Sequence, residues 1–143
     1  ACVAVEHRKG SVLNLLWRAV VQYAFQIKAR YMFGCSSVKT VNYHETQAIL
    51  KELESKGQLS QEWSIKPKSQ FEFSPEERSD GGTTQSQLTS VPPLFRSYLK
   101  AGAKIIGQPA IDRDFRCVDF LTVLKLADLA QSYENRYKTE FDT

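Results

Sequence analysis

Residues Cys2–Tyr31, CVAVEHRKGSVLNLLWRAVVQYAFQIKARY, contain the pattern on which the fold of this 143-residue chain depends. The pattern predicts a short strand at Cys2–Val5, a polar turn at Glu6–Ser11 and a long helix at Val12–Ala29. Arginine, lysine, glycine and serine occur in the turn. The first N–H groups of a helix have no partner within the helix and carry partial positive charge. The turn therefore predicts a site for a phosphate or an oxyanion.

The predicted helix has one broad apolar face, which we expect to pack on a sheet. Its apolar side chains recur at helical spacing, at Leu13, Leu16, Trp17, Val20, Ala24 and Ile27. Tyr31–Ser37 follows as a buried strand, and the succession of strand, helix and strand predicts a right-handed crossover between parallel neighbours. Gly34 within this strand indicates either a bulge or a close approach by the backbone of a ligand.

The remainder of the chain predicts a mixed α/β domain. Asn42 and Glu45 form the pattern of a capping box in front of a helix at Tyr43–Ser55. The segment 57–91 is rich in polar residues, proline and glycine, and predicts a long insertion loop with a few apolar anchors. The elements expected after it are a helix that opens at Val91–Leu94, a hairpin of strands Lys104–Gln108 and Cys117–Leu126 around a turn at Pro109–Arg116, and a closing helix and tail at 126–129 and 133–138.

Composition argues against several classes of protein. A hydrophobic content of 42% is enough for a core, and polar residues interrupt the longest apolar run, Leu13–Ile27, so no membrane span is predicted. The three cysteines form neither a CxxC pair nor a Cys/His ligand spacing. This argues against a metal site and against a disulfide framework, so we expect a cytoplasmic protein.

Positive charge gathers in two zones, although the net charge is only +3. Residues 1–30 contain five lysines and arginines against one acidic residue, and residues 91–116 contain five against two. Such zones are typical of a surface that binds an acidic protein or a phosphate, but ordinary solvated surfaces explain them equally well. The basic side chains that we expect to contact a partner are Arg18, Arg96, Lys100 and Lys104.

Few side chains suggest a catalytic role. Asp119 is charged within an otherwise apolar strand, so it either pairs with Arg113 or Arg116 or faces an active cleft. His44 lies on a polar helix and is a weaker candidate for a general base. Cys35 has no histidine or aspartate partner in the local sequence, which favours a packed core thiol over a nucleophile.

Six sequence blocks carry a resemblance to a known family: Cys2–Arg8, Leu13–Ala19, Met32–Ser37, Pro92–Ala103, Gly107–Phe115 and Asp119–Phe120. In this order they resemble the ornithine-lipid N-acyltransferases, a group within the GNAT superfamily whose members are also labelled hemolysins. The resemblance covers nearly the whole chain and is weakest in the segment 57–91. Several blocks in one order make it far more specific than any single motif.

The resemblance implies a GNAT-like mixed sheet flanked by helices, with 1–143 forming only the second, C-terminal part of the acyltransferase domain. It places the acyl-donor turn at Arg8, Lys9, Gly10, Ser11 and Val12. Lys9 and Ser11 replace small residues of the usual motif, which argues against acetyl-CoA. The implied donor is a 3-hydroxyacyl chain on the phosphopantetheine of acyl carrier protein, or an acyl-CoA, with no tightly bound cofactor. The acidic carrier protein agrees with the two basic zones.

The implied reaction transfers a fatty acyl group from acyl carrier protein to the amine of an amino acid such as ornithine, as in lyso-ornithine lipid synthesis. A neutral amine attacks the thioester, and backbone N–H groups stabilise the oxygen that gains charge. Two alternatives stay open. One is a synthase of N-acyl amino acids or acyl-homoserine lactones, and the other is a non-catalytic module that binds an acidic partner or a membrane surface.

The resemblance also predicts a region upstream of this chain, including a glutamate that is the first candidate for the base. The sequence has no initiator methionine and starts where the second half of the fold starts. We therefore expect a fragment or one of two chains, with the missing N-terminal half of the fold as a partner. A location in the cytoplasm, peripheral at the inner face of the membrane, and no nucleic acid partner complete these expectations.

Overall fold

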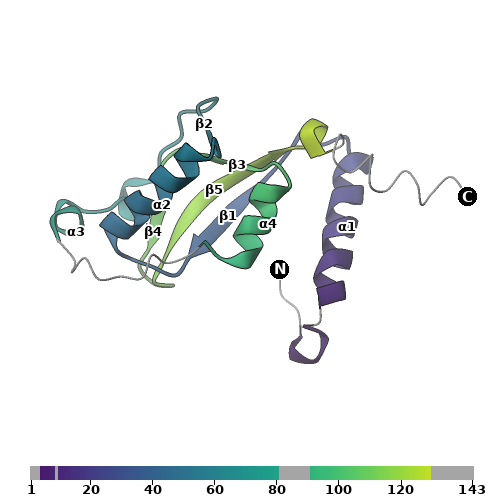
Figure 1. Ribbon diagram of the computed structural model, residues 1–143, viewed down its shortest axis with the longest axis horizontal. Helices are drawn as coiled ribbons and strands as arrows, with labels where there is room; N and C mark the ends of the chain where they lie inside the picture. The colour runs from purple at the N-terminus through teal and green to yellow at the C-terminus, as the bar shows by residue number, and fades with distance from the viewer. Residues whose placement is uncertain (1–3, 9, 81–90, 130–143) are drawn as a thin grey trace, which may run out of the picture.

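A computed structural model describes residues 4–8, 10–80 and 91–129, and it shows a five-stranded mixed sheet with flanking helices (Figure 1). The predicted α/β class is confirmed. No helix in this part of the chain combines the length and the apolar character needed to cross a bilayer. In chain order the elements are η1 (Val5–His7, a 3₁₀ helix), α1 (Gly10–Gln26), β1 (Tyr31–Val38), α2 (Tyr43–Ser55), β2 (Leu59–Ser60), η2 (Ser69–Phe71, a 3₁₀ helix), α3 (Pro75–Ser79), α4 (Pro93–Lys100), β3 (Lys104–Ile106), β4 (Ala110–Asp112) and β5 (Cys117–Lys125).

The central strand of the sheet is β5. It pairs antiparallel with β1 over eight residue pairs, from Tyr31 opposite Lys125 to Val38 opposite Val118. On its other side β5 pairs antiparallel with β3 and β4, and β2 extends the sheet beyond β3 in parallel. The unbroken register of β1 contradicts the predicted option of a bulge at Gly34.

The predicted turn at Pro109–Arg116 contains a strand that the sequence did not indicate. β4 pairs with the start of β5, which shortens the turn to 113–116. The preceding strand, β3, ends at Ile106, and Gly107 follows with a φ of 67°. A Cβ atom at Gly107 would lie 2.3 Å from the carbonyl oxygen of Ile65. The two backbones therefore cross so closely that only glycine fits at this position.

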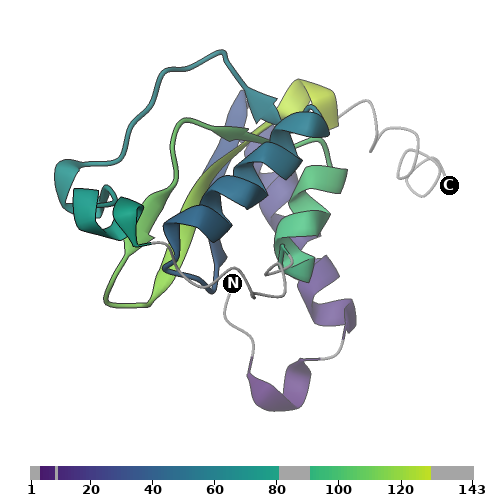
Figure 2. The same ribbon diagram turned by 60° about the vertical axis from the view of Figure 1, so that its left-hand side comes forward.

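The core consists of two apolar clusters. The larger one fills the space between the sheet, α2 and α4, where the rings of Phe95 and Phe120 lie 5.6 Å apart. The second cluster joins α1 to the end of β5 and to the helical residues that follow it, and its buried members are Val21, Ala24, Ala103, Leu124, Leu126 and Leu129. Because α1 contacts only the second cluster, it stands beside α4 and not over the middle of the sheet (Figure 1, Figure 2).

The structure corrects the prediction for α1 in its bounds and in its buried face. The helix runs from Gly10 to Gln26, whereas Val12–Ala29 was expected. Val21 and Ala24 are buried, but Leu16, Val20 and Ile27, three of the six predicted apolar positions, are exposed among the described residues. The uncovered residues form a second helical stripe, 40–62% exposed, which we call the outer stripe of α1: Leu16, Val20, Tyr23 and Ile27.

The predicted strand before α1 is wrong at both of its described residues, because Ala4 lies in no strand and Val5 begins the 3₁₀ helix η1. Cys2 and Val3 lie outside the described residues. The parallel neighbour predicted for β1 is not seen in the described ranges, where the one partner of β1 is the antiparallel strand β5. The other side of β1, which has no strand partner among these residues, is called the open edge of β1 below.

The helix predicted at Tyr43–Ser55 is confirmed as α2. The side chain of Asn42 caps it by accepting a hydrogen bond from the N–H of Glu45 at 2.9 Å. The predicted capping box is incomplete, because the Glu45 carboxylate binds the hydroxyl of Thr40 and not the N–H of Asn42. The Asn42 N–H instead donates to the Thr40 hydroxyl.

Arg113 fixes the described part of the 57–91 segment to the sheet. Its guanidinium donates to the carbonyl oxygens of Gln70 and Glu72 at 2.8 and 2.9 Å, and to both carboxylate oxygens of Glu77 at 2.7 and 3.0 Å. The expectation that Arg113 pairs with Asp119 is therefore wrong. Residues 81–90 of the segment and the predicted tail at 133–138 lie outside the described residues.

Candidate functional site

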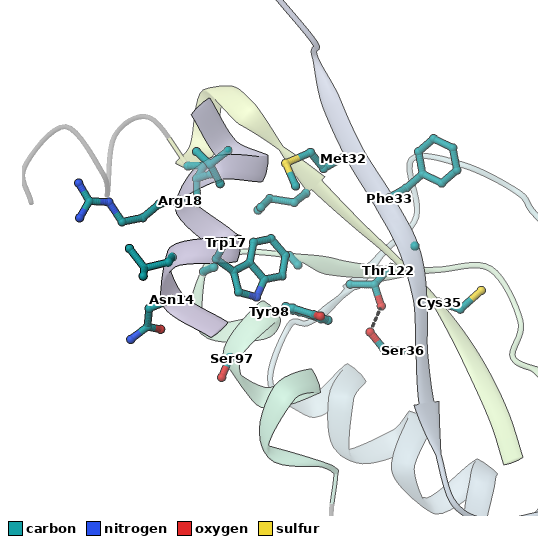
Figure 3. A pocket seen from close by; sticks show the side chains of 17 residues that line it. Asn14, Trp17, Arg18, Met32, Phe33, Cys35, Ser36, Ser97, Tyr98 and Thr122 are labelled. Atoms are coloured by element: carbon teal, nitrogen blue, oxygen red, sulfur yellow. Dashed lines mark hydrogen bonds between the residues drawn. The ribbon is translucent and has the colours of Figure 1, made fainter. Parts of the chain in front are cut away.

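A pocket of about 860 Å³ opens between α1, β1 and α4 (Figure 3). This volume is within the range of sites for small molecules and cofactors. Its walls are largely apolar, because many of its lining residues also belong to the second core cluster. The main apolar side chains are Trp17, Val21, Met32, Ala101, Leu124 and Leu129.

One wall of the pocket is an aromatic pair from two helices. The ring of Trp17 on α1 meets the ring of Tyr98 on α4 edge to face, with 4.9 Å between centroids. Such pairs add to the stabilisation that burial gives. Burial raises the pKa of the Tyr98 hydroxyl, so this group stays neutral at physiological pH. The pair therefore holds α1 against α4 and offers an apolar surface to a ligand.

The inner side of the pocket carries two buried hydroxyl groups. Ser36 on β1 and Thr122 on β5 are 4% and 7% exposed. Thr122 Oγ1 donates to Ser36 Oγ at 2.7 Å, and it also lies 3.1 Å from the carbonyl oxygen of Phe120 (Figure 3). Both residues line the pocket. The inner side of the pocket thus carries a pair of hydroxyl groups among apolar side chains.

The start of α1 lies close to the pocket. Asn14 and Arg18 line it, and α1 begins at Gly10, one turn before Asn14, or about 6 Å along the helix axis. Arg8 is exposed and precedes the helix, and Lys9 lies outside the described residues. The predicted donor turn, Arg8–Val12, therefore lies within about one helical turn of the pocket-lining residue Asn14.

The pocket extends to the open edge of β1. Phe33, Gly34 and Cys35 all line it, and Phe33 is 80% exposed. Figure 3 shows Phe33 and Cys35 pointing away from Trp17 and Tyr98, so the pocket passes around this edge. Cys35 is exposed, which corrects the prediction of a packed core thiol. Desolvation, followed by the charge of Asp119, raises the pKa of Cys35 and keeps the thiol protonated.

The two predicted catalytic candidates do not line the pocket. Asp119 accepts a hydrogen bond from the Ser37 hydroxyl at 2.5 Å, whereas an arginine partner was one of the two predicted options. Strand alternation puts Asp119 on the face of β5 opposite to Thr122 and Leu124. His44 is exposed on α2, with its ring 5.6 Å from that of Tyr43.

The predicted docking residues occupy three elements. Arg18 is half-buried at the pocket, whereas Arg96 and Lys100 lie one turn apart on the exposed side of α4. Lys104 is exposed at the start of β3, and its ammonium donates to the carbonyl oxygen of Gly57 at 2.6 Å. Because α1 and α4 touch through Trp17 and Tyr98, three of the four cations belong to adjacent helices.

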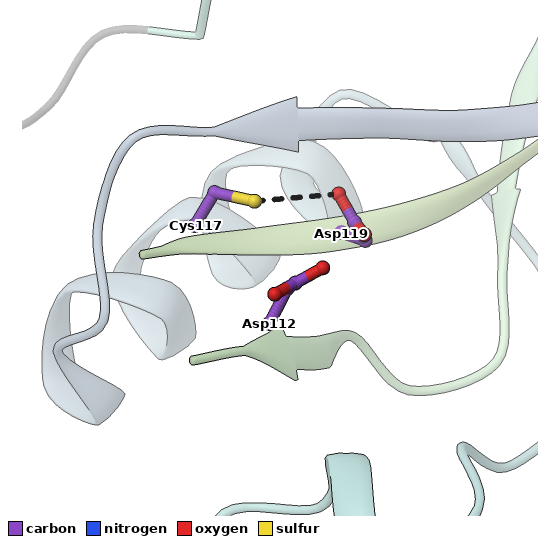
Figure 4. Close-up of side chains that lie close together, drawn as sticks. All are labelled: Asp112, Cys117 and Asp119. Atoms are coloured by element: carbon purple, nitrogen blue, oxygen red, sulfur yellow. Dashed lines mark hydrogen bonds between the residues drawn. The ribbon is translucent and has the colours of Figure 1, made fainter. Parts of the chain in front are cut away.

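On the opposite face of the sheet, Asp112, Cys117 and Asp119 have their ligand atoms within 4.8 Å of one another (Figure 4). The Cys117 thiol donates to Asp119 at 3.8 Å. Desolvation and then the two carboxylates raise the pKa of Cys117. The thiol is therefore held as a hydrogen-bond donor within this cluster. No sequence pattern indicated this cluster, because β4 was not predicted.

The sequence did not reveal two pairs of pocket residues, Trp17 with Tyr98 and Ser36 with Thr122. In each pair the two residues are more than 80 positions apart, and only tertiary packing brings them together. Gly34 was the one local signal, because the predicted option of a close ligand approach falls at the pocket. The other residues gave ordinary core or helix patterns.

The chain is similar along nearly its whole length to L-ornithine N(alpha)-acyltransferases, which confirms the resemblance inferred from the sequence blocks. It is 28% identical over 141 residues to the protein from Rhizobium meliloti, covering 96% of this chain and 47% of the relative. The relatives from Agrobacterium fabrum and Brucella abortus are 26% and 25% identical and are covered to 48% and 50%. The chain thus spans about half the length of these relatives. No protein-family model matches it, and no solved structure is significantly similar.

Proposed function

We propose that this chain is the acyl-donor part of an N-acyltransferase that moves a fatty acyl group from the thioester of acyl carrier protein to the amine of an amino acid such as ornithine. The similarity to L-ornithine N(alpha)-acyltransferases supports acyl transfer. The observation that carries the assignment to this chain is the apolar pocket of about 860 Å³ beside the start of α1. An apolar chain with a polar attachment matches such a site.

In the proposed complex, the acyl chain lies against Trp17, Val21 and Leu124, and its thioester lies at the open edge of β1. Backbone N–H groups along that edge are available as donors to the thioester oxygen, because no described strand takes them up. The phosphate of the carrier arm is placed at the start of α1, where the helix dipole and Arg8 favour negative charge.

The proposed reaction needs no covalent enzyme intermediate. The neutral amine of the acceptor attacks the thioester carbonyl carbon and forms the C–N bond, and the C–S bond then breaks. A base takes one proton from the attacking nitrogen, and the carrier leaves as a thiolate that takes up this proton and becomes a thiol. We place this base outside the pocket residues of this chain, because desolvation raises the pKa values of Tyr98 and Cys35 and keeps both groups protonated. Asp119 lies on the opposite face of β5.

We propose that the remaining half of the sheet covers the outer stripe of α1 and the open edge of β1. The relatives are about twice as long as this chain, so they have a further region of the required size. Exposed apolar stripes and unpaired strand edges are usually covered in native proteins. The acceptor amino acid and the base would then come from the side that this half contributes.

Expression of the gene that encodes this chain, followed by mass spectrometry of the extracted lipids, tests the proposed function. We expect the lipid extract to contain an N-acylated amino acid that cells without the gene lack. Ornithine is the first acceptor to test. A matched strain carries Ala103→Trp, which fills the pocket at a buried position, and it is expected to lose this product. Expression of the intact gene without any N-acylated amino acid would contradict the proposal.

A further inference from the structure

Two partly buried carboxylates lie on the face of the sheet opposite to α2 and α4. Asp112 on β4 and Asp119 on β5 have carboxylate oxygens within 4.8 Å of each other (Figure 4). No lysine or arginine of the described ranges forms an ion pair with either of them. Like charges this close repel each other, and a bound cation removes the repulsion. The two carboxylates are therefore complementary to a positively charged ligand.

The hydrogen bonds of the two aspartates leave oxygen atoms open to a ligand. The Ser37 hydroxyl and the Cys117 thiol both donate to Oδ1 of Asp119, at 2.5 and 3.8 Å. Oδ2 of Asp119 has no donor in the part of the chain that the structure describes. Asp112 accepts a hydrogen bond from the N–H of Phe115 at 2.9 Å, also through Oδ1. These bonds fix both carboxylates and leave one oxygen of each for an external donor.

The pocket reaches the same face of the sheet, and this observation does not depend on the carboxylates. The pocket passes around the open edge of β1, where Cys35 lines it and points away from the inner walls (Figure 3). Ser37 and Asp119 form the next pair on this face, about 7 Å along β1 from Cys35. Desolvation and then the charge of Asp119 raise the pKa of Cys35. The negative charge of Asp119 is therefore felt at the mouth of the pocket.

The proposed reaction needs an acceptor on this side of β1. The acyl chain occupies the space beside α1 in the proposed complex, so the amine reaches the thioester around the open edge of β1. The attacking amine must be neutral, whereas carboxylates favour an ammonium group. They therefore suit a second amine, one that does not attack. Ornithine, the acceptor proposed above, has such an amine at the end of its side chain, and this amine is protonated at neutral pH as that of lysine is.

We propose that Asp112 and Asp119 are specificity-determining residues that bind the side-chain ammonium of the acceptor, so that the enzyme acylates diamino acids in preference to amino acids with uncharged side chains. This inference rests on the proposed function, because it takes the acceptor to be an amino acid. The distance along β1 from Cys35 to Ser37 separates the reacting amine from the bound ammonium. Hydrogen bonds to charged groups of this kind give a preference of about 10- to 100-fold.

Steady-state kinetics with the purified product of the intact gene measure this preference. The donor is a fatty acyl group on acyl carrier protein. The two acceptors are ornithine and norvaline, which has the same carbon chain without the terminal amine. We expect kcat/KM for ornithine to exceed that for norvaline about 10- to 100-fold. Equal values would overturn the inference and leave the proposed acyl transfer standing, whereas acylation of neither amino acid would overturn both.

The test variants remove one negative charge each and keep the existing hydrogen bonds. Asp119→Asn can still accept from the Ser37 hydroxyl, and Asp112→Asn can still accept from the Phe115 N–H. In each variant kcat/KM for ornithine should fall about tenfold through a higher KM, while the value for norvaline stays the same. A merely structural defect would lower both values.

The matched control is Asp114→Asn, which removes an exposed negative charge from the turn between β4 and β5. This control should keep the full preference for ornithine. A full preference in both test variants would overturn the inference, and so would a loss in both variants that is equal for the two acceptors. Either result would leave the transfer of an acyl group to an amino acid unaffected.

Discussion

At the scale of single residues, Gly107 is the position where backbone conformation and packing constrain the sequence most. Its φ of 67° disfavours any residue with a Cβ atom, and that atom would lie 2.3 Å from the Ile65 carbonyl oxygen. Gly57 has a similar φ of 64° but open space around it. The two glycines therefore separate the conformational cost from the steric cost.

We expect Gly57→Ala to lower the free energy of unfolding by about 1 kcal/mol, the ordinary cost of a left-handed alanine. Gly107→Ala should lower it by at least about 2–3 kcal/mol, because β3 and the backbone at Ile65 must separate as well. Urea unfolding of both variants measures the difference. Equal losses would show that the chain near Ile65 does not hold its position against β3.

Residue-scale prediction from the sequence succeeded where the partners are local. The cap at Asn42 bonds a residue three positions away, and the glycine-terminated end of α2 follows from the same local pattern. It failed for Asp119, because the sequence offered nearby arginines while the actual partner, Ser37, is 82 positions away. The pair of Ser36 and Thr122 was not predicted for the same reason, because the two residues are 86 positions apart and their hydroxyls meet only after β1 and β5 have paired.

At the scale of elements, Arg113 links the β4–β5 turn to η2 and α3, and Glu77 carries the titratable part of this link. The hydrogen bond from Arg113, followed by that from the Ser74 N–H, lowers the pKa of Glu77 below its ordinary value of 4.5. A lowered pKa in the folded state stabilises the protein above the ordinary value. This contribution is lost as the pH falls below 4.5 through the lowered pKa.

Arg113→Met should therefore lower the urea midpoint most near pH 7, and the difference from wild type should shrink as the pH falls below about 4.5. Part of the difference remains at low pH, because Arg113 also binds the carbonyls of Gln70 and Glu72. Glu77→Gln is the matched variant and should flatten the pH dependence while Arg113 keeps those two bonds. A difference that stays constant from pH 7 to pH 3 would contradict this account.

The exposed surface of α4 is where we expect acyl carrier protein to dock. Arg96 and Lys100 are exposed on the helix that holds Tyr98, so they lie near the pocket without lining it. Replacing both with glutamine should weaken the binding of purified acyl carrier protein, and the loss should shrink as salt screens the charges. Titrations at about 50 and about 300 mM salt measure the affinity for the carrier protein. The control variant replaces Lys51 and Lys66, two exposed lysines outside α4, with glutamine. Affinity that is independent of salt would rule out docking by these charges.

The helices show how far patterns predict elements. Apolar periodicity placed α1 and α2 to within three residues, because side chains at helical spacing must share a face. Periodicity could not tell which part of a broad apolar face is covered, since α1 has enough apolar residues for two contacts. Nor could it find β4, whose three residues are too short for an alternating pattern.

At the scale of the whole molecule, the sheet has an open edge at β1, and the outer stripe of α1 lies exposed beside the same pocket. The resemblance predicted half of a larger sheet, and relatives about twice as long agree with that prediction. The fold class followed from the order of the elements. The position of α1 could not be predicted in the same way. Among the described residues this helix packs through Val21 and Ala24, while its outer stripe stays exposed.

The outer stripe predicts how the 143-residue chain behaves in isolation. Exposed apolar stripes of this kind drive association, so sedimentation should show oligomers that grow with protein concentration. Val20→Lys with Tyr23→Lys should shift the chain toward monomers, because both side chains belong to the stripe. Gln22→Lys, exposed on the same helix but outside the stripe, serves as the control and should change nothing. A wild-type chain that stays monomeric at high concentration would count against an interface on this surface.

The most direct measurement of the central claim, that the pocket between α1, β1 and α4 holds the acyl group, is photolabelling. A fatty acyl thioester with a diazirine in its chain is added to the protein, irradiated and mapped by peptide mass spectrometry. The account predicts that the label falls on residues 12–26, 31–38 and 93–103, and that excess unlabelled acyl thioester prevents it. Labelling confined to α2 or to residues 57–80, or labelling that excess unlabelled thioester does not reduce, would contradict it.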